Sequence, residues 1–272
     1  MRVSATGDSE KVATPSGLTI LKVKEAYKAF GGLVAIHNVS FDVKRGEIMA
    51  VIGPNGSGKT TLFNLINGFL PLLQGDIWFE ERSLKRLPAH CIASLGIART
   101  FQQLQLFTNM TIIENVMVGR HLRSKANIMD TALRLPHTRV EERDIFEAAM
   151  SKLTMVGLKE KAFSLPLSFP YGKQKLIEIA RALATEPKLL LMDEPAGGLS
   201  TQEIEELSQL IYHIRDSGIT VLLVEHRMEL AMSVADKVIV LNFGEKIAEG
   251  TPAEVQNNEQ VITAYLGEET YS

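Results

Sequence analysis

The residues best suited to chemistry form one glycine-rich run, Gly53-Pro54-Asn55-Gly56-Ser57-Gly58-Lys59-Thr60, which continues into Thr61. The run fits the pattern G-x-x-x-x-G-K-[ST], in which glycines let backbone N–H groups converge on phosphate oxygens at the start of a helix. Lys59 would reach the β- and γ-phosphates of a nucleotide, and the Thr60 hydroxyl would complete the shell of a Mg²⁺ ion. The alternative is a chance glycine-rich turn, which a chain of this length would contain only about once in a hundred cases.

A second candidate is the carboxylate pair Asp193 and Glu194, which directly follows the apolar run Leu189–Met192. Buried charge without a partner is costly, so acidic residues at the tip of a buried strand need a reason to be there. Asp193 would hold Mg²⁺, directly or through water, and Glu194 would take a proton from an attacking water molecule as general base. Taken alone, the pair fits an ordinary acidic turn equally well. Together with the phosphate-binding pattern, the chemical role is favoured.

The phosphate-binding run has the context that its chemistry requires. It lies between a predicted strand, Glu47–Ile52, and a predicted helix, Lys59–Asn67, which Gly68 would end. Further strands are predicted at Leu18–Lys24, Val39–Val43, Asp76–Phe79, Leu189–Met192 and Ile219–Val224. The only tryptophan, Trp78, is predicted to lie in the core. Continuous apolar strands that alternate with helices indicate a parallel sheet covered on both faces.

Two stretches have a helical pattern. Residues 109–165 are predicted to form a helical insertion in the α/β chain, with Ile145, Ala149, Leu153 and Val156 on one face. Within it, the charged segment Arg120–Arg139 is predicted to be a surface loop. The helix between the last two strands has its own apolar stripe, formed by Ile204, Leu207, Ile211 and Ile214.

The composition limits the classes of function. The chain has 272 residues, 45% of them hydrophobic, and a net charge of −3, so no global basic field argues for nucleic acid. Its single cysteine rules out an internal disulfide framework and is compatible with a reducing cytosol. No apolar run approaches the roughly 18 residues of a membrane-spanning helix, so a membrane link would come through partner proteins. Residues 1–17 are polar and are predicted to form a disordered tail.

A third motif, Phe169-Pro170-Tyr171-Gly172-Lys173-Gln174, lies between the two candidate sites and precedes a helix rich in apolar residues. With this motif the chain resembles the ATP-binding-cassette (ABC) ATPases, whose signature Leu-Ser-Gly-Gly-Gln lies shortly before the acidic strand. The resemblance covers Leu18 to Gly267 and leaves 268–272 as a C-terminal tail. It implies an α/β P-loop NTPase with a mainly parallel sheet, an antiparallel β subdomain and an inserted helical subdomain at about 109–165.

The resemblance also implies a role for individual residues. Phe30 occupies the place of the aromatic residue that stacks on adenine, although it would also suit the core of the first strand. Gln102 resembles the glutamine that contacts Mg²⁺ and the attacking water, and His226 resembles the histidine that senses the γ-phosphate. A lone glutamine is more often a solvated surface residue, and a lone histidine at a strand end is more often structural. The implied ligands are ATP and Mg²⁺, with Lys59, Glu194 and His226 catalytic, Pro170, Tyr171, Gly172, Lys173 and Gln174 in the nucleotide site, and Thr60, Gln102 and Asp193 at the metal.

Two positions depart from the family pattern. Pro170 replaces the signature serine and offers neither a hydroxyl nor a backbone N–H, and Tyr171 replaces the first glycine. In the family this segment binds the γ-phosphate of nucleotide held by the opposite subunit, so we expect the site that it completes to hydrolyse weakly or to rely on the helix dipole alone. The alternative is that Pro170 only makes a good helix start. Ser200 stands where the family often has aspartate, and with Glu203 it has the spacing of a capping box.

The resemblance implies partners as well. A second ABC ATPase subunit, identical or related, would complete the nucleotide sites, and two membrane-spanning permease subunits would bind a groove that includes residues 103–110. Leu104, Leu106 and Phe107 would also suit the core of the subdomain, and docking is slightly favoured. Within the family the chain is most similar to the longer ATPase type of branched-chain amino acid importers. The residues that support this importer class are Arg99-Thr100-Phe101-Gln102, the Tyr171-Gly172 variant and the ending 261–267, and the extra charged segment around Arg120–Arg139 suggests the longer type. A solute-binding protein is implied indirectly, and the place of action is the cytoplasmic face of the inner membrane, as a peripheral protein.

Other readings differ in class. Urea, amide or lipopolysaccharide transport stays open because other subunits choose the solute. A soluble ABC ATPase in DNA repair would separate Lys59 and Asp193 by a long coiled coil, and one in translation would carry two cassettes. A P-loop kinase would not explain residues 169–174 or His226.

Overall fold

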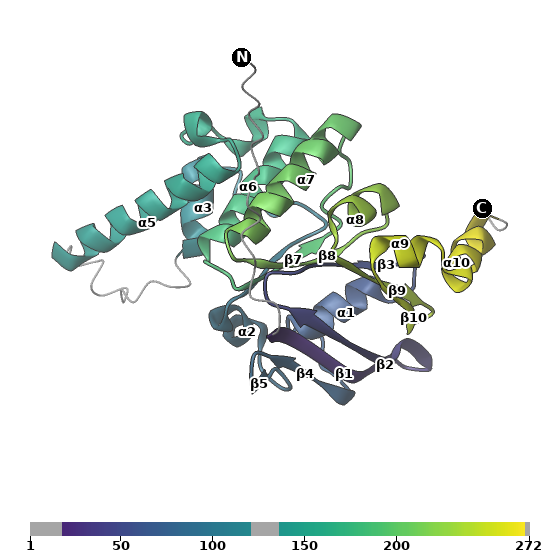
Figure 1. The fold of residues 1–272 in the computed structure, drawn as a ribbon. Helices are drawn as coiled ribbons and strands as arrows, with labels where there is room; N and C mark the ends of the chain where they lie inside the picture. The colour runs from purple at the N-terminus through teal and green to yellow at the C-terminus, as the bar shows by residue number, and fades with distance from the viewer. Residues whose placement is uncertain (1–17, 121–135, 270–272) are drawn as a thin grey trace, which may run out of the picture.

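The structure, a computed structural model, describes residues 18–120 and 136–269. Two sheets and a group of helices form the fold (Figure 1). The strands are β1 (Thr19–Phe30), β2 (Leu33–Lys44), β3 (Ile48–Ile52), β4 (Gln74–Phe79), β5 (Arg82–Ser83), β6 (Ile97–Thr100), β7 (Leu189–Asp193), β8 (Thr220–Val224), β9 (Lys237–Asn242) and β10 (Glu245–Gly250). The α-helices are α1 (Lys59–Ile66), α2 (Ala89–Leu95), α3 (Ile112–Arg120), α5 (Pro136–Met155), α6 (Tyr171–Ala184), α7 (Thr201–Asp216), α8 (Met228–Val234), α9 (Pro252–Gln256) and α10 (Glu259–Glu269).

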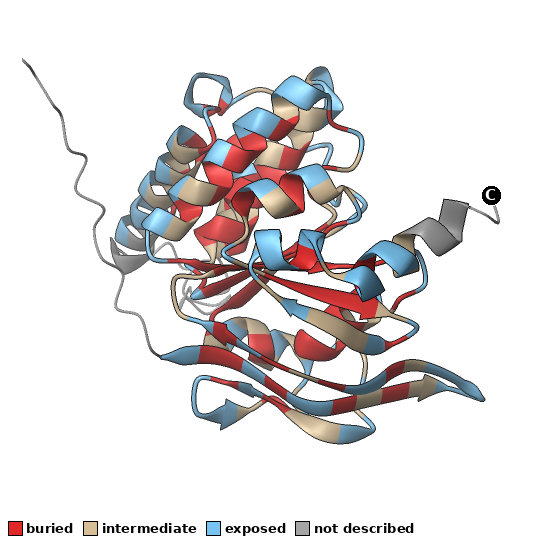
Figure 2. Ribbon diagram, turned by 45° about the vertical axis from the view of Figure 1, so that its right-hand side comes forward, coloured by how far each residue is buried: buried red, intermediate tan, exposed pale blue. Residues whose placement is uncertain are grey.

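A six-stranded sheet in the order β10-β9-β3-β8-β7-β6 forms the centre of the molecule. Its strands run parallel except for the hairpin between β9 and β10. Every residue of β3, β7 and β8 is buried, which explains their uninterrupted apolar sequences (Figure 2). Because these strands are parallel neighbours, the loops that follow them leave the sheet at one edge, where ligands bind in open α/β sheets.

A second, antiparallel sheet in the order β2-β1-β4-β5 lies below the first in Figure 1, with α1 between the two. One apolar cluster joins them: Phe63 and Ile66 of α1 pack with Ile36 and Val39 of β2 and with one face of the central sheet. This packing fixes the start of α1, and so the phosphate-binding run, against both sheets.

The other face of the central sheet is covered by α6, α7 and α8. Helices α3 and α5 pack against α6 and against each other, and they lie in the range predicted for the helical insertion. The predicted helical face is confirmed, because Ile145, Ala149, Leu153 and Val156 are all buried. The predicted fold class is confirmed as well: a mainly parallel core, an antiparallel sheet and a helical part.

Some details of the prediction differ or fall outside the described ranges. Trp78 is 38% exposed, so its predicted place in the core is wrong; the alternation of β4 buries Ile77 and Phe79 and turns position 78 to the other face. Residues 121–135, most of the predicted surface loop, lie outside the described part, as do 1–17 and 270–272. The division into tails and one ATPase domain stays a prediction. Among residues 18–120 and 136–269, no helix has the length and apolar character needed to span a bilayer.

Candidate nucleotide site

The phosphate-binding run links the end of β3 to the start of α1, as its sequence predicts. Gly53 and Gly58 have φ values of 149° and 103°, a region that residues with a Cβ atom rarely adopt. A Cβ atom would lie 2.1 Å from the Leu241 carbonyl oxygen at Gly53 and 2.5 Å from the Ala35 carbonyl oxygen at Gly58. The loop is therefore pressed against two strand ends, and only glycine fits at these two positions.

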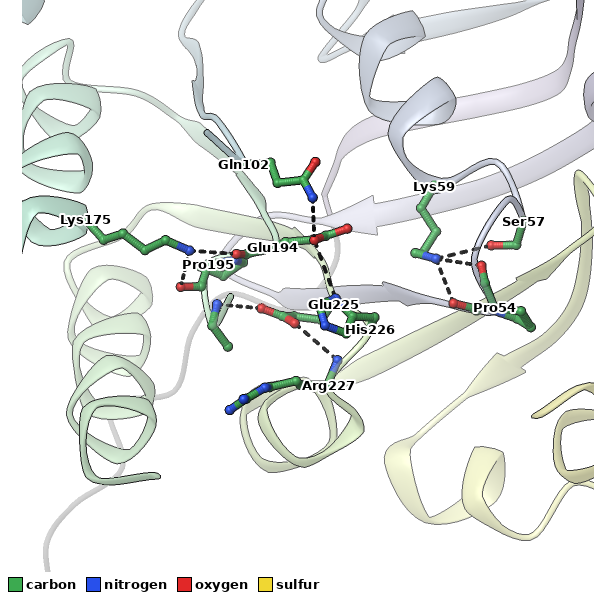
Figure 3. A network of polar contacts seen from close by, with 12 residues as sticks. Pro54, Ser57, Lys59, Gln102, Lys175, Glu194, Pro195, Glu225, His226 and Arg227 are labelled. Atoms are coloured by element: carbon green, nitrogen blue, oxygen red, sulfur yellow. Dashed lines mark hydrogen bonds and ion pairs between the residues drawn. The ribbon is translucent and has the colours of Figure 1, made fainter. Parts of the chain in front are cut away.

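Lys59 is 6% exposed and folds back over this loop. Its Nζ donates to the carbonyl oxygens of Gly53 at 2.7 Å and Pro54 at 2.8 Å, and lies 3.5 Å from the Ser57 Oγ (Figure 3). The ammonium group is thus held at the mouth of the loop, next to the exposed Thr60 at the first turn of α1. The N–H groups of this first turn give the site partial positive charge.

Asp193 ends β7 with its side chain 2% exposed. Its Oδ2 accepts a hydrogen bond from Arg99 Nη2 at 2.5 Å, whereas its Oδ1 is buried and has no hydrogen-bond partner among the described residues. A buried carboxylate oxygen that lacks a donor is rare and suits a cation. The hydroxyl of Thr60, at the start of α1, is likewise an oxygen donor, and oxygen ligands are the kind that Mg²⁺ prefers, so the chemistry of these residues fits this ion.

Glu194, the next residue, has φ of 46°, a conformation that costs a non-glycine residue about 1–3 kcal/mol and tends to occur at functional sites. Its N–H donates to the Val224 carbonyl, and its own carbonyl accepts from Lys175 Nζ at 3.0 Å. This backbone turns the carboxylate toward Gln102 Nε2, at 2.9 Å, and His226 Nδ1, at 3.5 Å (Figure 3). Three residues predicted for the site thus meet at one point.

Two buried charged side chains, Lys175 and Glu225, bond to the backbone next to the group formed by Gln102, Glu194 and His226. Burial lowers the pKa of Lys175, and the nearby Glu225, Glu178 and Glu194 oppose that shift. Burial likewise raises the pKa of Glu225, although the N–H groups of Ala196 and Arg227 donate to its carboxylate and oppose the rise. Glu225 therefore ties the loop after Glu194 to the residues that flank His226.

Phe30 lies at the end of β1 with its ring 46% exposed. The Lys28 ammonium group is 5.1 Å from the ring centre, within the range of a cation–π contact. This exposure speaks against the alternative that the ring belongs to the core, and leaves part of the ring open to solvent.

The signature-like segment 169–174 is anchored mainly on α7 and the loop before it. Pro170 is the N-cap residue of α6, and its carbonyl accepts from the N–H groups of Lys173 and Gln174. Gly172 packs so closely on Glu203 that a Cβ atom would lie 2.2 Å from a carboxylate oxygen. Ser200 and Glu203 form the predicted capping box. The structure does not bring this segment into the group formed by Gln102, Glu194 and His226.

A groove of about 560 Å³ opens between the core and the helical part. Its lining includes Phe69, Arg99, Phe101, Phe107, Glu178 and Arg181. Phe107, from the predicted docking segment 103–110, is 47% exposed, whereas Leu106 packs against the core. The Arg181 guanidinium stacks on the Phe107 ring and donates to the Gln105 carbonyl, which fixes the segment along the groove.

Comparison with known proteins decides the family. Residues 36–197 match the family described as ABC transporter. The chain belongs to the ABC transporter family. Residues 245–271 also match a family described as branched-chain amino acid ATP-binding cassette transporter. The predicted resemblance is confirmed, and the chain is an ABC ATPase that binds nucleotide.

Relatives and solved structures agree with this assignment. The high-affinity branched-chain amino acid transport ATP-binding protein LivG of Salmonella typhimurium is 42% identical over 250 residues, which cover 92% of this chain and 98% of LivG. The ADP conformation of MJ1267, an ATP-binding cassette of an ABC transporter, superposes with a TM-score of 0.82 at 31% identity, covering 92% and 100% of the two chains. The dimeric structure of a post-hydrolysis state of the ATP-binding cassette MJ0796, bound to ADP and Pi, superposes with a TM-score of 0.72 at 26% identity, covering 85% of this chain and 98% of the MJ0796 chain.

Reasoning from sequence missed the residues that hold the predicted ones in place. These are Arg99 beside Asp193, Lys175 beneath Glu194, and Glu225 beside His226. Arg99 and Glu225 are charged residues in or directly after an apolar, buried stretch, and this pattern was the available signal for them; Lys175 follows Lys173 and Gln174 and has no such signal.

Proposed function

We propose that this ABC ATPase is the ATP-hydrolysing subunit that energises an importer for branched-chain amino acids. The observation that carries the hydrolytic role is the meeting of Gln102, Glu194 and His226 at the edge of the sheet where the phosphate-binding loop begins. β3 and β8 are parallel neighbours with Val51 opposite Val224, so the two loops leave the sheet side by side. The solute class rests on the LivG relative and on the match of residues 245–271.

In this proposal the loop 53–61 and Lys59 hold the nucleotide phosphates, and Phe30 stacks on the adenine. Thr60, Gln102 and Asp193 would hold Mg²⁺, which when bound supplies neutralisation of phosphate charge. Glu194 accepts a proton from the attacking water. Gln102, whose side-chain amide lies 2.9 Å from the Glu194 carboxylate, orients that water. His226, half-exposed at the same point, contacts the γ-phosphate.

A second ATPase subunit completes each site in this proposal. The segment 170–174 faces nucleotide on the partner through the N–H groups of Tyr171, Gly172 and the first turn of α6. The dimer of the related cassette MJ0796 supports such pairing. ATP then bridges both subunits by charge-assisted contacts, and loss of the γ-phosphate removes them, which provides opening and closing.

Two permease subunits receive this motion, and a solute-binding protein delivers the amino acid to them. We place the permease contact in the groove lined by Phe69, Phe101 and Phe107, because an amphipathic helix lays its apolar face into such a groove. The ATPase then acts as a peripheral protein at the cytoplasmic face of the inner membrane.

The hydrolytic role is tested with Lys59→Ala and Glu194→Gln in the complex that co-purifies with the chain. Lys59→Ala removes magnesium-dependent nucleotide binding, whereas Glu194→Gln binds ATP, traps the closed pair and abolishes turnover. Lys22→Ala, an exposed lysine on β1, is the matched control and leaves both unchanged. Normal turnover by Glu194→Gln would show that another residue is the base.

The solute is tested by identifying the membrane proteins that co-purify and by measuring ATPase stimulation in proteoliposomes. Stimulation by a binding protein loaded with leucine, isoleucine or valine supports the proposal, and stimulation only by urea, an amide or lipopolysaccharide contradicts the solute class. ATP turnover that responds to nucleic acid or ribosomes would contradict the transport role.

The weak hydrolysis expected from Pro170 is tested separately. Pro170→Ser restores a hydroxyl and an N–H at the N-cap of α6, where serine is a favourable residue. We expect the ATPase rate of the assembled transporter to rise; an unchanged rate would show that the helix N-terminus and the remaining amides suffice.

A further inference from the structure

Arg99 is an arginine buried in a strand, a placement that needs an explanation. It lies in β6 after Ile97 and Ala98, and its side chain is 7% exposed. A buried guanidinium group is stable only when it is paired and hydrogen-bonded. Two of its nitrogens are paired as a fork: Nη1 donates to Asn64 Oδ1 at 2.6 Å, and Nη2 donates to Asp193 Oδ2 at 2.5 Å, whereas Nε has no hydrogen-bond partner among the described residues.

Three aromatic rings hold the guanidinium plane in place. Its central carbon lies 5.7 Å from the centre of Phe63, 5.8 Å from Phe69 and 5.3 Å from Phe101. Such cation–π contacts strengthen when the charge is desolvated, and planar arginine stacks on rings better than lysine does. The side chain therefore has little freedom to turn, so its fork has a defined direction.

The fork determines which oxygen of Asp193 is left over. The parallel pairing of β6 and β7 sets Arg99 opposite Leu191, two residues before Asp193, so the side chains of Arg99 and Asp193 lie on the same face of the sheet and meet. Arg99 engages Oδ2, and Oδ1 stays buried without a hydrogen-bond partner in the described part of the chain. Arg99 thus pairs with Oδ2 and fixes the orientation of the whole carboxylate. Oδ1 points in a fixed direction and can still bind a cation.

We propose that Arg99 is a positioning residue, which orients Asp193 so that Oδ1 faces the magnesium ion of the bound nucleotide. This inference rests on the proposed function, because it assumes that Asp193 serves the metal. It adds a residue outside the three motifs to the machinery. It also gives a reason for an arginine in β6, where an apolar residue would satisfy the packing.

Two physical effects of Arg99 oppose each other, and the experiment has to separate them. The positive charge repels Mg²⁺ and on its own would weaken metal binding. The fixed direction of Oδ1 strengthens metal binding, and losing an orienting partner of a ligand typically costs about 10–100-fold in metal affinity. We expect the gain from orientation to outweigh the repulsion.

The test uses Arg99→Lys in the full chain, because lysine keeps the charge but is a single point donor and cannot span Asn64 and Asp193 together. The affinity for a fluorescent ATP analogue is measured at increasing free Mg²⁺ and in EDTA, without any requirement for turnover. We expect the Mg²⁺ concentration for half-maximal affinity to rise about tenfold or more, with affinity in EDTA unchanged. Arg99→Met, which also removes the charge, shifts the requirement in the same direction.

Arg215→Met is the matched control, because Arg215 also pairs with aspartates, Asp216 and Asp236, and stacks on an aromatic ring, that of Tyr212. It lies at the opposite edge of the sheet, beside the start of β3, since Asp236 accepts from the N–H of Ile48. Its magnesium requirement stays that of the wild type.

The outcomes are distinct. An unchanged magnesium requirement in Arg99→Lys, or a lower one in Arg99→Met, would overturn the inference and make Arg99 a structural ion pair or a repelling charge. Equal loss of affinity with and without Mg²⁺ would also count against it. In an Asp193→Asn background, Arg99→Lys should add no further shift if it acts through Asp193. A wild-type chain without magnesium-dependent binding would instead refute the proposed function itself.

Discussion

Replacing Glu178 by glutamine tests the electrostatics of α6 directly. Glu178 is 3% exposed, and its Oε1 accepts from the N–H of Phe101 at 3.2 Å. Burial raises the pKa of this carboxyl group from 4.5 to about 7, against the opposing effects of the Phe101 amide and of Arg181 and Lys175. Glutamine has nearly the same shape and keeps an oxygen for the Phe101 amide, so Glu178→Gln removes the titration and little else.

The magnitude follows from the shift. At about 1.4 kcal/mol for each pKa unit, a rise from 4.5 to about 7 makes ionised Glu178 destabilising by about 3 kcal/mol. The folded pKa is raised, so the folded state binds this proton more tightly than the unfolded chain does. The stability that protonation of Glu178 contributes is therefore fully present below about pH 4.5 and is lost as the pH rises through about 7.

The assay is urea unfolding of both proteins at several pH values between 5 and 8, followed by circular dichroism. We expect the free energy of unfolding of Glu178→Gln, relative to that of the wild type, to increase by about 2–3 kcal/mol between pH 5 and pH 8. Glu205→Gln, which removes an exposed carboxylate from α7, controls for net charge. A difference that is independent of pH, or that shrinks toward pH 8, would refute the reasoning.

Three further variants follow from the contacts of the site. Gly53→Ala puts a Cβ atom 2.1 Å from the Leu241 carbonyl, so we expect loss of nucleotide binding by fluorescence titration, and unchanged affinity would contradict the close packing. Ser200→Ala breaks the capping box of α7 and should cost about 1 kcal/mol in urea unfolding, while an unchanged midpoint would mean that the cap contributes nothing. Lys175→Met frees the carbonyl of Glu194, so we expect kcat to fall while the Kd for nucleotide holds; equal changes in both would contradict a role in positioning Glu194.

The sequence alone was enough to predict the elements that carry periodic or motif signals. The strand before Gly53, the helix after it and the buried strand ending at Asp193 lie where they were predicted, because glycine punctuation and continuous apolar runs are local features. The order of the phosphate run, the signature-like segment and the acidic strand was distinctive enough to predict the family.

The supporting contacts could not be predicted, because they join residues far apart in the chain. Arg99 and Asp193 are separated by 94 positions, and Glu225 meets the Ala196 amide across 29. Nothing local in the sequence states which strands are neighbours. The prediction that Trp78 lies in the core was wrong for a related reason. A hydrophobic residue type predicts burial, but the alternation of side chains along β4 places position 78 on the exposed face.

The helix that begins with the signature-like segment also contacts the loops of the proposed catalytic group of its own subunit. Lys175 and Glu178 lie three residues apart on the buried side of α6, and they bond to the backbone of Glu194 and of Phe101, the residue before Gln102. Both loops that carry the Gln102–Glu194 pair are therefore attached to one helix. Hydrogen bonds near 3 Å weaken steeply when their geometry is displaced, so a small movement of α6 changes the distance between the Gln102 amide and the Glu194 carboxylate. A partner that presses on Tyr171 and Gly172 at the start of α6 would thus adjust hydrolysis in the subunit that carries the segment, besides completing the opposite site, and the kcat effect of Lys175→Met measures that link.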